Sequence, residues 1–433
     1  MAKKTSVFWF RRDLRWHDNH ALLKAFLHSE EVIPVFIFDT NILDQLDKND
    51  RRVNLIFDRL QKLNIELGSK KINIQYGNPE HVFNKIIRTF DVEAVFCNED
   101  YEPYAISRDA RIKELCQEKG IDFYSFKDHL IFHKNQILSQ EGKPYSVYTP
   151  YMKKWMTNFN KSLLKPYESK HHLKKISTKK LDSIESISEI GFSKTSYHLF
   201  SPKLSENSIK DYENVRNLPT HDTTQISVHI RFGFLSIREL TNVAYKYSEC
   251  LLRELIWNSF FSQILWHNPH VISQPFKKKY NGIDWNSEEK INLWKEGRTG
   301  FPIIDAGMRQ LNKTGYMHGR VRMLTASFLV KNMGIDWRLG EQYFAEKLMD
   351  FDLASNNGNW QWVAGTGCDA APYFRIFNPI SQQKQYDPNL IYCKKYIDDF
   401  DSYTKNTEPI VDLKLTRMES IERYKRCLSN EKS

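Results

Sequence analysis

The most informative stretch of this sequence is residues 350–379, which read DFDLASNNGNWQWVAGTGCDAAPYFRIFNP. It combines carboxylates, adjacent asparagines and two tryptophans one residue apart, with almost no aliphatic periodicity. Asn356, Asn357 and Gly358 are poor helix formers, because Asn side chains compete for backbone hydrogen bonds and Gly loses much freedom on folding. We therefore expect this stretch to be shaped around a molecule that it binds. Core packing is the competing interpretation for either tryptophan alone.

Length and charge set the outer bounds. A chain of 433 residues with 41% hydrophobic residues is too long for one typical core, so we expect two globular domains. The net charge of +10 permits a polyanionic partner through counterion release, although basic surface is often only solvated.

Cysteine spacing and hydropathy exclude several classes. The six cysteines have no CxxC or metal-ligand spacing, which predicts a reducing compartment and no metal site. No apolar run approaches the roughly 18 residues of a membrane span, and MAKKTSVFWF leads into a strand pattern rather than a signal peptide. We expect a soluble, cytoplasmic protein. The absence of GxGxxG and GxxxxGK[ST] argues against an NAD-dependent dehydrogenase or a P-loop enzyme.

The first part of the chain alternates strand and helix patterns. Short apolar runs of strand length are residues 6–10, 32–38, 72–76, 94–97 and 121–126. Helical patterns between them end at Gly68 and Gly120, as helices often do. This alternation predicts a doubly wound parallel sheet in an α/β domain, residues 1–135.

Charged residues follow the first predicted strand, where parallel sheets bind ligands. They are Arg11, Arg12, Asp13, Arg15, Asp18 and Asn19. A charged loop capped by Asp13 or Asp18 is an equally good interpretation.

After residue 135 the sequence pattern changes first to a polar linker and then to amphipathic helices. Residues 136–204 are predicted to be an interdomain linker, because much of this segment is rich in Lys, Ser and His with little periodicity. Residues 205–433 show amphipathic helical patterns at 253–266, 305–313, 320–333 and 340–349, which predict an all-α domain. At its start, Thr223, Thr224 and Ser227 offer hydroxyls and backbone N–H groups to an anion, although a simple N-cap needs only one hydroxyl.

DLASNNGNWQW and TGCDAAPYFRIFNP resemble the flavin-pocket signature of the photolyase/cryptochrome family, and specifically of DNA photolyases. The similarity continues in WFRRDLRWHDN, FPIIDAGMRQL, MHGRVRM and DWRLGEQYF, so it covers nearly the whole chain. It implies FAD bound in the helical domain. It also implies light-dependent repair of cyclobutane pyrimidine dimers in DNA, by electron transfer from photoexcited reduced FAD to a flipped-out dimer.

The resemblance implies specific flavin ligands. Tyr212 belongs to the phosphate-binding segment, and Thr223, Thr224 and Ser227 match ligands of the pyrophosphate. The residues that match positions near the isoalloxazine are Arg322, Asp350, Asp352 and Asn356. Of these, Arg322 and Asp350 match an ion pair over the ring, for which a buried structural salt bridge is the competing interpretation. The Asn356 amide faces flavin N5, where it can donate or accept a hydrogen bond and so stabilise reduced flavin.

The resemblance also implies the residues that bind the lesion. Trp257 and Trp362 match the aromatic walls around the dimer, Met323 touches it, and Glu254 hydrogen-bonds the thymine edge. Phosphates around the lesion are gripped by Arg216, Arg320 and Arg375. Gly319 and Asn258 depart from common family residues, which puts lesion affinity in question rather than reaction type.

Two further elements follow from the resemblance. A chain of three tryptophans that relays an electron from the surface to FAD is matched by Trp360, Trp337 and Trp285, and indole is suited to this role. Without the resemblance, core packing is the expected role of each. The first domain can hold an antenna chromophore. Tyr104 and Ala105 stand where folate-binding members carry Asn-Glu, so a deazaflavin or a second flavin is favoured over folate.

Alternatives within the family are a (6-4) photolyase and a blue-light-sensing cryptochrome. The (6-4) enzymes carry two active-site histidines one turn apart, whereas this chain has His318 followed by Arg322 and Met323. Cryptochromes commonly append a long tail, for which the roughly fifty residues after Pro379 leave little room. A non-catalytic DNA-binding protein would explain the charge but not the clustered Asn, Asp and Trp. We expect a monomer whose partner is UV-damaged DNA.

Overall fold

A computed structural model describes residues 4–430 of the chain. They form two compact units, each assembled from separate segments. The first unit contains the chain up to Gln136 together with Asn158–Leu199 and Ile226–Lys246, and the second contains Ile137–Thr157, Phe200–Gln225 and the chain from Tyr247 onward. The domain boundaries predicted from the sequence stay a prediction, since this division is discontinuous and distributes residues 136–204 over both units.

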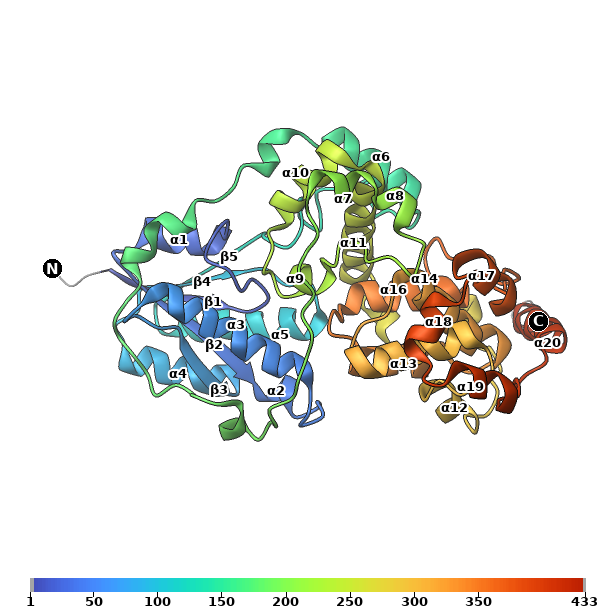
Figure 1. Ribbon diagram of the computed structural model, residues 1–433. Coiled ribbons are helices and arrows are strands. Elements are labelled where there is room, and N and C mark those ends of the chain that lie inside the picture. The colour runs from blue at the N-terminus through green and yellow to red at the C-terminus, as the bar shows by residue number, and fades with distance from the viewer. Residues whose placement is uncertain (1–3, 431–433) are drawn as a thin grey trace. The chain divides into compact units, whose positions relative to one another are not determined.

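The first unit is built on a parallel sheet (Figure 1). Its strands are β1 (Thr5–Phe10), β2 (Glu31–Asp39), β3 (Asn73–Gly77), β4 (Ala94–Asn98) and β5 (Asp122–Phe126). Their order is β3-β2-β1-β4-β5, and Val7 of β1 lies opposite Ile33 of β2 and Val95 of β4. The predicted doubly wound α/β fold is confirmed.

Helices cover both faces of this sheet. They are α1 (His20–His28), α2 (Thr40–Leu43), α3 (Arg51–Leu67), α4 (Pro79–Thr89) and α5 (Pro103–Glu118), with α9 (Ser227–Arg231) and α10 (Ile237–Tyr247) at the end of the unit's last segment. Helices α4 and α5 pack on one face through a cluster that contains Trp9, Val35 and Phe83. Every residue of β1 is buried, as expected for a sheet covered on both sides.

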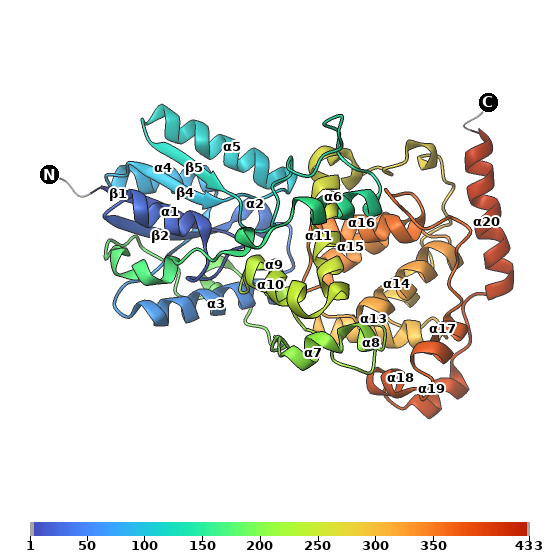
Figure 2. The ribbon, with the colours of Figure 1, turned by 90° about the horizontal axis from the view of Figure 1, so that it is seen from above.

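The second unit is helical throughout. Its helices are α6 (Tyr148–Asn158), α7 (Glu206–Lys210), α8 (Tyr212–Val215), α11 (Glu249–His267), α12 (Ile291–Lys295), α13 (Pro302–Thr314), α14 (Gly319–Ser327), α15 (Trp337–Lys347), α16 (Leu353–Ala364), α17 (Pro379–Tyr386), α18 (Ile391–Tyr396), α19 (Phe400–Asn406) and α20 (Leu413–Asn430). Figure 2 shows α14, α15 and α16 grouped beside α11 within this unit. A π-helical turn, Phe328–Asn332, extends α14 over part of the predicted helix at 320–333. No helix in the described range is long and apolar enough to cross a membrane.

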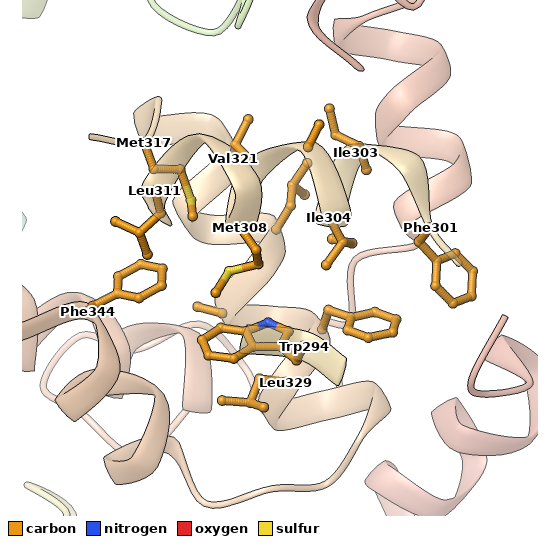
Figure 3. Close-up of a cluster of buried hydrophobic side chains, with 14 of the residues drawn as sticks. Trp294, Phe301, Ile303, Ile304, Met308, Leu311, Met317, Val321, Leu329 and Phe344 are labelled. Carbon is orange, nitrogen blue, oxygen red and sulfur yellow. The ribbon is translucent and has the colours of Figure 1, made fainter. Parts of the chain in front are cut away.

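The core of the helical unit surrounds Trp294 (Figure 3). Met308 and Leu311 of α13 and Phe344 of α15 pack around its fully buried indole, whose Nε1 donates to the Thr325 carbonyl at 3.0 Å. This cluster fixes α13, α14 and α15 relative to one another.

Residues 353–364 form α16 although their composition disfavours a helix. Asp352 caps its first turn by accepting from the Ser355 N–H at 3.0 Å, and Gly365 ends it in the left-handed region with φ 84°. A Cβ on Gly358 would lie 2.1 Å from Phe261 of α11, so glycine permits the close approach of the two helices. Tertiary packing therefore outweighs intrinsic propensity here.

Candidate functional site

Helix α16 is the central element of the candidate site. It packs against α11, α14 and α15, and these four helices carry half of the predicted site residues. Asn258 of α11 donates to Ser355 of α16 at 3.0 Å. The departure at Asn258 therefore supplies a helix–helix contact.

A buried amide network orients Asn356. Its Nδ2 donates to the Glu341 carbonyl at 3.1 Å, which leaves Oδ1 and the second N–H of Nδ2 for a ligand. Asn357 donates to Glu341 Oε1 at 3.2 Å and to the Val271 carbonyl at 2.9 Å, and its Oδ1 accepts from Gln361 at 3.2 Å. Burial raises the pKa of Glu341 to about 7, against the Asn357 hydrogen bond, which favours the charged form. The α16 amides are thus held rigidly from α15.

Arg322 and Asp350 form an ion pair of 2.8 Å. Burial alone would lower the pKa of Arg322, but the Asp350 carboxylate outweighs it and holds that pKa above its ordinary value. Arg322 Nε donates to the Met317 carbonyl at 2.7 Å, so the guanidinium is fixed from two sides. The predicted pairing of these two residues is present in the structure.

Two buried polar atoms, one in this ion pair and one beside it, accept or donate no hydrogen bond within the described residues. Within residues 4–430, Asp350 Oδ1 and His318 Nε2 have no hydrogen-bond partner. Unpaired buried groups cost about 1–3 kcal/mol each, so native proteins rarely leave them unmatched. A ligand that carries N–H and hydroxyl donors would satisfy the acceptor. His318 Nε2 is a donor, because Nδ1 accepts from the Arg320 N–H at 3.2 Å. The two atoms therefore fit a flavin nucleotide, which carries N–H and hydroxyl donors for Asp350 and carbonyl acceptors for His318.

The predicted phosphate ligands are divided between the units. Thr223 hydrogen-bonds Tyr316, whose ring lies 5.5 Å from the Arg322 guanidinium, so Thr223 is linked to the ion pair. The Thr224 side chain is buried in the second unit, whereas Ser227 begins α9 in the first unit. Helix α9 has no side-chain N-cap hydrogen bond, which weighs against the capping interpretation of these hydroxyls.

The residues predicted to bind the lesion lie mainly on α11 and α14. Glu254 pairs with Arg216 at 2.6 Å, and Arg216 lies 5.8 Å from the Tyr212 ring. The structure therefore joins a predicted thymine contact to a predicted phosphate contact. Both side chains are about one-third exposed, 37% for Glu254 and 32% for Arg216, and remain accessible to a ligand.

The other predicted lesion contacts are partly exposed. Arg320 of α14 donates to Asn217 at 2.7 Å, and Met323 lies one turn further along the same helix. Arg375 is exposed 5.9 Å from the ring of Trp362, which is half-buried on α16. At Gly319, an added Cβ would meet no atom within 4 Å.

The three relay tryptophans share one hydrophobic cluster. Trp360 and Trp337 are buried in it, and half-buried Trp285 packs against it. Phe344 contacts Trp360 edge to face at 5.0 Å, and Tyr424 contacts Trp285 in the same way at 6.3 Å. Within the described chain, no ring contact joins the three tryptophans directly. Their role as a relay stays a prediction.

Sequence reasoning missed two aromatic residues at this site. Trp294 contacts Trp360 edge to face at 6.3 Å, and Tyr148 of α6 stacks on Trp257 with centroids 3.7 Å apart. The segment that carries Tyr148 falls within residues 136–204, which the sequence predicts to be a linker. The alternating aromatics of VYTPYMKKW were the available signal for a packed helix.

The charged loop after β1 uses its carboxylates inside the first unit. Asp13 accepts from Asn98 at 2.5 Å and from the Arg11 N–H at 2.8 Å, and Asp18 accepts from Arg238 at 2.8 Å. Asn19, rather than either aspartate, caps α1. Arg11 Nη2 is a buried donor with no hydrogen-bond partner among residues 4–430.

Tyr104 and Ala105, the residues that bear on the identity of the antenna chromophore, also lie in the first unit. Tyr104 lies in the first turn of α5, and its hydroxyl donates to Asp39 at 2.5 Å. Ala105, the next residue, is buried. Burial and the Asp39 hydrogen bond raise the pKa of the Tyr104 phenol to about 12. The Tyr104 hydroxyl is already engaged within the chain, since it also accepts from Asn41 at 3.0 Å, and Ala105 has no polar side-chain atom.

Family models match both parts of the chain. Residues 6–170 match the DNA photolyase model, and residues 251–424 match the model of the FAD-binding domain of DNA photolyase. A deoxyribodipyrimidine photo-lyase of Synechococcus is 34% identical over 90% of this chain and 87% of its own length. The protein of that name from Escherichia coli is 31% identical over 91% and 89%.

Solved structures agree with these matches. An archaeal photolyase from Sulfolobus tokodaii with two FAD molecules has a TM-score of 0.84 and 34% identity, covering 98% of this chain and 100% of its own. A class III photolyase from Agrobacterium tumefaciens has a TM-score of 0.85 and 27% identity, covering 99% and 98%. The protein is a flavoprotein with an FAD-binding helical domain. The chain belongs to the DNA photolyase family.

Proposed function

We propose that this protein is a light-dependent deoxyribodipyrimidine photolyase that repairs cyclobutane pyrimidine dimers in DNA. The observation that carries the proposal is the arrangement of α11, α14 and α16. It joins a buried ion pair with an unused acceptor, Asp350 Oδ1, to half-buried aromatic residues and to the paired Glu254 and Arg216. Deoxyribodipyrimidine photo-lyases that match about 90% of this chain support it.

FAD supplies the photochemical electron transfer when it is bound in this domain. The chain holds and orients it. Arg322 and Asp350 would hold the ring system, Asp352 would bind near the ring and ribose, and the Asn356 amide would hydrogen-bond N5. Tyr212, Thr223, Thr224 and Ser227 would bind the phosphates.

The lesion meets a second set of side chains. Trp257 and Trp362 enclose the flipped bases, Met323 contacts them, and Glu254 accepts a hydrogen bond from a thymine edge. Arg216, Arg320 and Arg375 bind the flanking phosphates. The 2.6 Å ion pair with Arg216 orients the Glu254 carboxylate on α11.

The cyclobutane lesion is favoured over the (6-4) photoproduct by the surroundings of His318. Burial, together with the charges of Arg322 and Arg320, lowers the pKa of His318 to about 4. The imidazole is therefore neutral near pH 7 and is a poor proton donor. One helical turn on, Arg322 and Met323 stand where a second histidine would be needed.

Three further properties belong to this proposal. Trp360, Trp337 and Trp285 relay an electron to the flavin during photoreduction. The protein acts as a cytoplasmic monomer on UV-damaged DNA. Its antenna chromophore is a deazaflavin or a second flavin, for which the structure from Sulfolobus tokodaii with two FAD molecules is a precedent. The absorption spectrum of chromophores released by denaturation identifies the antenna.

The test uses the photoreduced protein and an oligonucleotide with one thymine cyclobutane dimer. We expect loss of the dimer under blue light and none in darkness, and no loss of a (6-4) photoproduct under the same light. A flavin-containing protein that leaves the dimer intact would contradict the proposed substrate. Repair of the (6-4) photoproduct instead would reassign it.

A further inference from the structure

One face of Trp257 is covered by Tyr148, a residue outside the set assigned to FAD or DNA. The two ring centroids are 3.7 Å apart and the ring planes differ by 5°, so the rings are stacked face to face. Tyr148 is 7% exposed, whereas Trp257 is only half-buried. Tyr148 therefore covers one face of Trp257, Phe261 lies 5.4 Å from the same ring, and part of the indole stays exposed to a planar base.

The stack is held at several points. The Tyr148 hydroxyl donates to the Arg253 carbonyl at 2.9 Å, on the same helix as Trp257 and one turn before it. The Tyr148 N–H donates to Asp369 Oδ2 at 3.0 Å. Phe260 contacts both rings edge to face, at 5.9 Å from Tyr148 and 5.6 Å from Trp257. The indole is thus fixed from behind and from one edge.

The anchor at Asp369 connects the stack to the segment that follows α16. Asp369 adopts a φ of 45°, in the left-handed region that residues other than glycine seldom occupy. Its carboxylate is thereby directed to the first residue of α6. Helix α6 then packs along α11, where Tyr151 contacts Phe260 at 5.3 Å and hydrogen-bonds Ser259 at 3.2 Å.

A wall that is fixed before binding loses less conformational entropy when it stacks on a ligand. Tyr148 lies behind Trp257, so its contribution depends on whether the ligand uses the indole. Undamaged DNA keeps its bases stacked in the duplex and binds chiefly through phosphates. Rigidity of Trp257 should therefore strengthen binding of a flipped lesion and leave undamaged DNA unaffected.

We propose that Tyr148 is a positioning residue that backs Trp257 and sets the preference of the protein for DNA containing a flipped pyrimidine dimer over undamaged DNA. This inference rests on the proposed function, in which Trp257 is a wall of the lesion pocket. It assigns α6 a role in substrate discrimination through α11.

The test compares Kd values of full-length variants for dimer-containing and undamaged oligonucleotides at one salt concentration. We expect Tyr148→Leu to weaken dimer binding roughly threefold to tenfold, the range that aromatic pairs contribute. Binding of undamaged DNA and the repair yield at saturating dimer should stay within about twofold. Tyr148→Phe keeps the ring and should restore the wild-type preference. If Tyr148→Leu does not fold, Tyr148→Met offers a longer, flexible side chain that also lacks a planar face.

Two controls separate positioning from general damage. Tyr151→Leu removes an aromatic residue of the same helix that contacts Phe260 rather than Trp257, and should leave the preference unchanged. In a Trp257→Leu background, Tyr148→Leu should have no additional effect. Equal weakening for both DNAs, an unchanged preference, or an undiminished effect without Trp257 would each overturn the inference. Wild-type protein with no preference for the dimer would instead overturn the proposed function.

Discussion

Two polar stretches of this chain were both candidates for ligand binding, but the structure uses their carboxylates differently. The loop after β1, residues 11–19, and the segment around the start of α16, residues 350–362, both follow the pattern of a binding loop. In the first, Asp13 and Asp18 accept hydrogen bonds from the chain itself. In the second, Asp350 keeps one buried oxygen without a partner in the described range. The distinction lies in which acceptors the fold leaves for a ligand, and composition alone does not contain it.

The largest expected effect is at Asp350. Asp350→Asn keeps the shape of the side chain but leaves Arg322 as a partly buried charge without its counterion. We expect the bound flavin to fall at least about tenfold and the unfolding free energy to fall by roughly 3–5 kcal/mol. Flavin absorbance per protein and urea denaturation measure these two quantities.

The matched control is Asp387→Asn in the same unit. Asp387 is a buried carboxylate that accepts from the N–H groups of Tyr392 and Cys393. Asp387→Asn should lower stability without lowering the flavin content of the folded protein. Equal flavin loss in both variants would show that Asp350 acts only through folding.

Asp128 of the first unit provides the opposite case. It is fully buried and pairs with Arg15 at 2.5 Å and with Arg238 at 2.7 Å. Asp128→Asn should cost roughly 3–5 kcal/mol of stability, while flavin per folded molecule stays within about twofold. Flavin loss as severe as in Asp350→Asn would break the comparison between the two stretches.

Asp128 also predicts a dependence on acid. Burial would raise its pKa, but Arg15 and Arg238 outweigh burial and hold the pKa far below its ordinary value. The pair therefore contributes its full stability above the unfolded pKa of about 4, and this contribution is lost as the pH falls below that value. Denaturation between pH 5 and 3 should show a smaller decline in Asp128→Asn than in wild type.

Glu341 should make the folding stability depend on pH in the opposite direction, and the effect should be smaller. Its folded pKa of about 7 lies above the unfolded value of 4.5, so the folded state holds the proton more tightly. Stability should therefore fall as the pH rises from 5 to 7, by roughly 2–3 kcal/mol. Glu341→Gln should remove this slope, which urea midpoints at several pH values measure. An unchanged slope would assign it to another group.

The smallest expected effect is at Gly319. A side chain there meets open space, so Gly319→Asn should change stability by less than about 0.5 kcal/mol. Added asparagine can donate to a lesion in the pocket, and we expect dimer affinity to rise modestly while undamaged DNA is bound as before. A large loss of stability would show that the first turn of α14 is more crowded than its contacts indicate.

The sequence predicted the fold class because its signals are local. Alternating strand and helix periods in residues 1–135 define the sheet, and helix ends at Gly68 and Gly120 follow from backbone geometry. The helix at 353–364 could not be expected from propensity, since it depends on the Asp352 cap and on the contact of Gly358 with Phe261. Tyr148 was missed because its partner is more than a hundred residues away in sequence.

Site prediction had a similar limit. The pairing of Arg322 with Asp350 was expected from the family resemblance, and the geometry agrees. The pairing of Glu254 with Arg216 was not expected, because the resemblance implies a different ligand contact for each residue. Roles that depend on bound FAD or DNA stay predictions until those molecules are observed.

A crystal structure of the flavin-bound protein tests most directly the claim that the unused acceptors of the α16 segment are completed by FAD. We expect an FAD donor within about 2.7–3.2 Å of Asp350 Oδ1 and the Asn356 amide opposite flavin N5. FAD bound elsewhere, or Asp350 Oδ1 paired with water while FAD is present, would contradict the account.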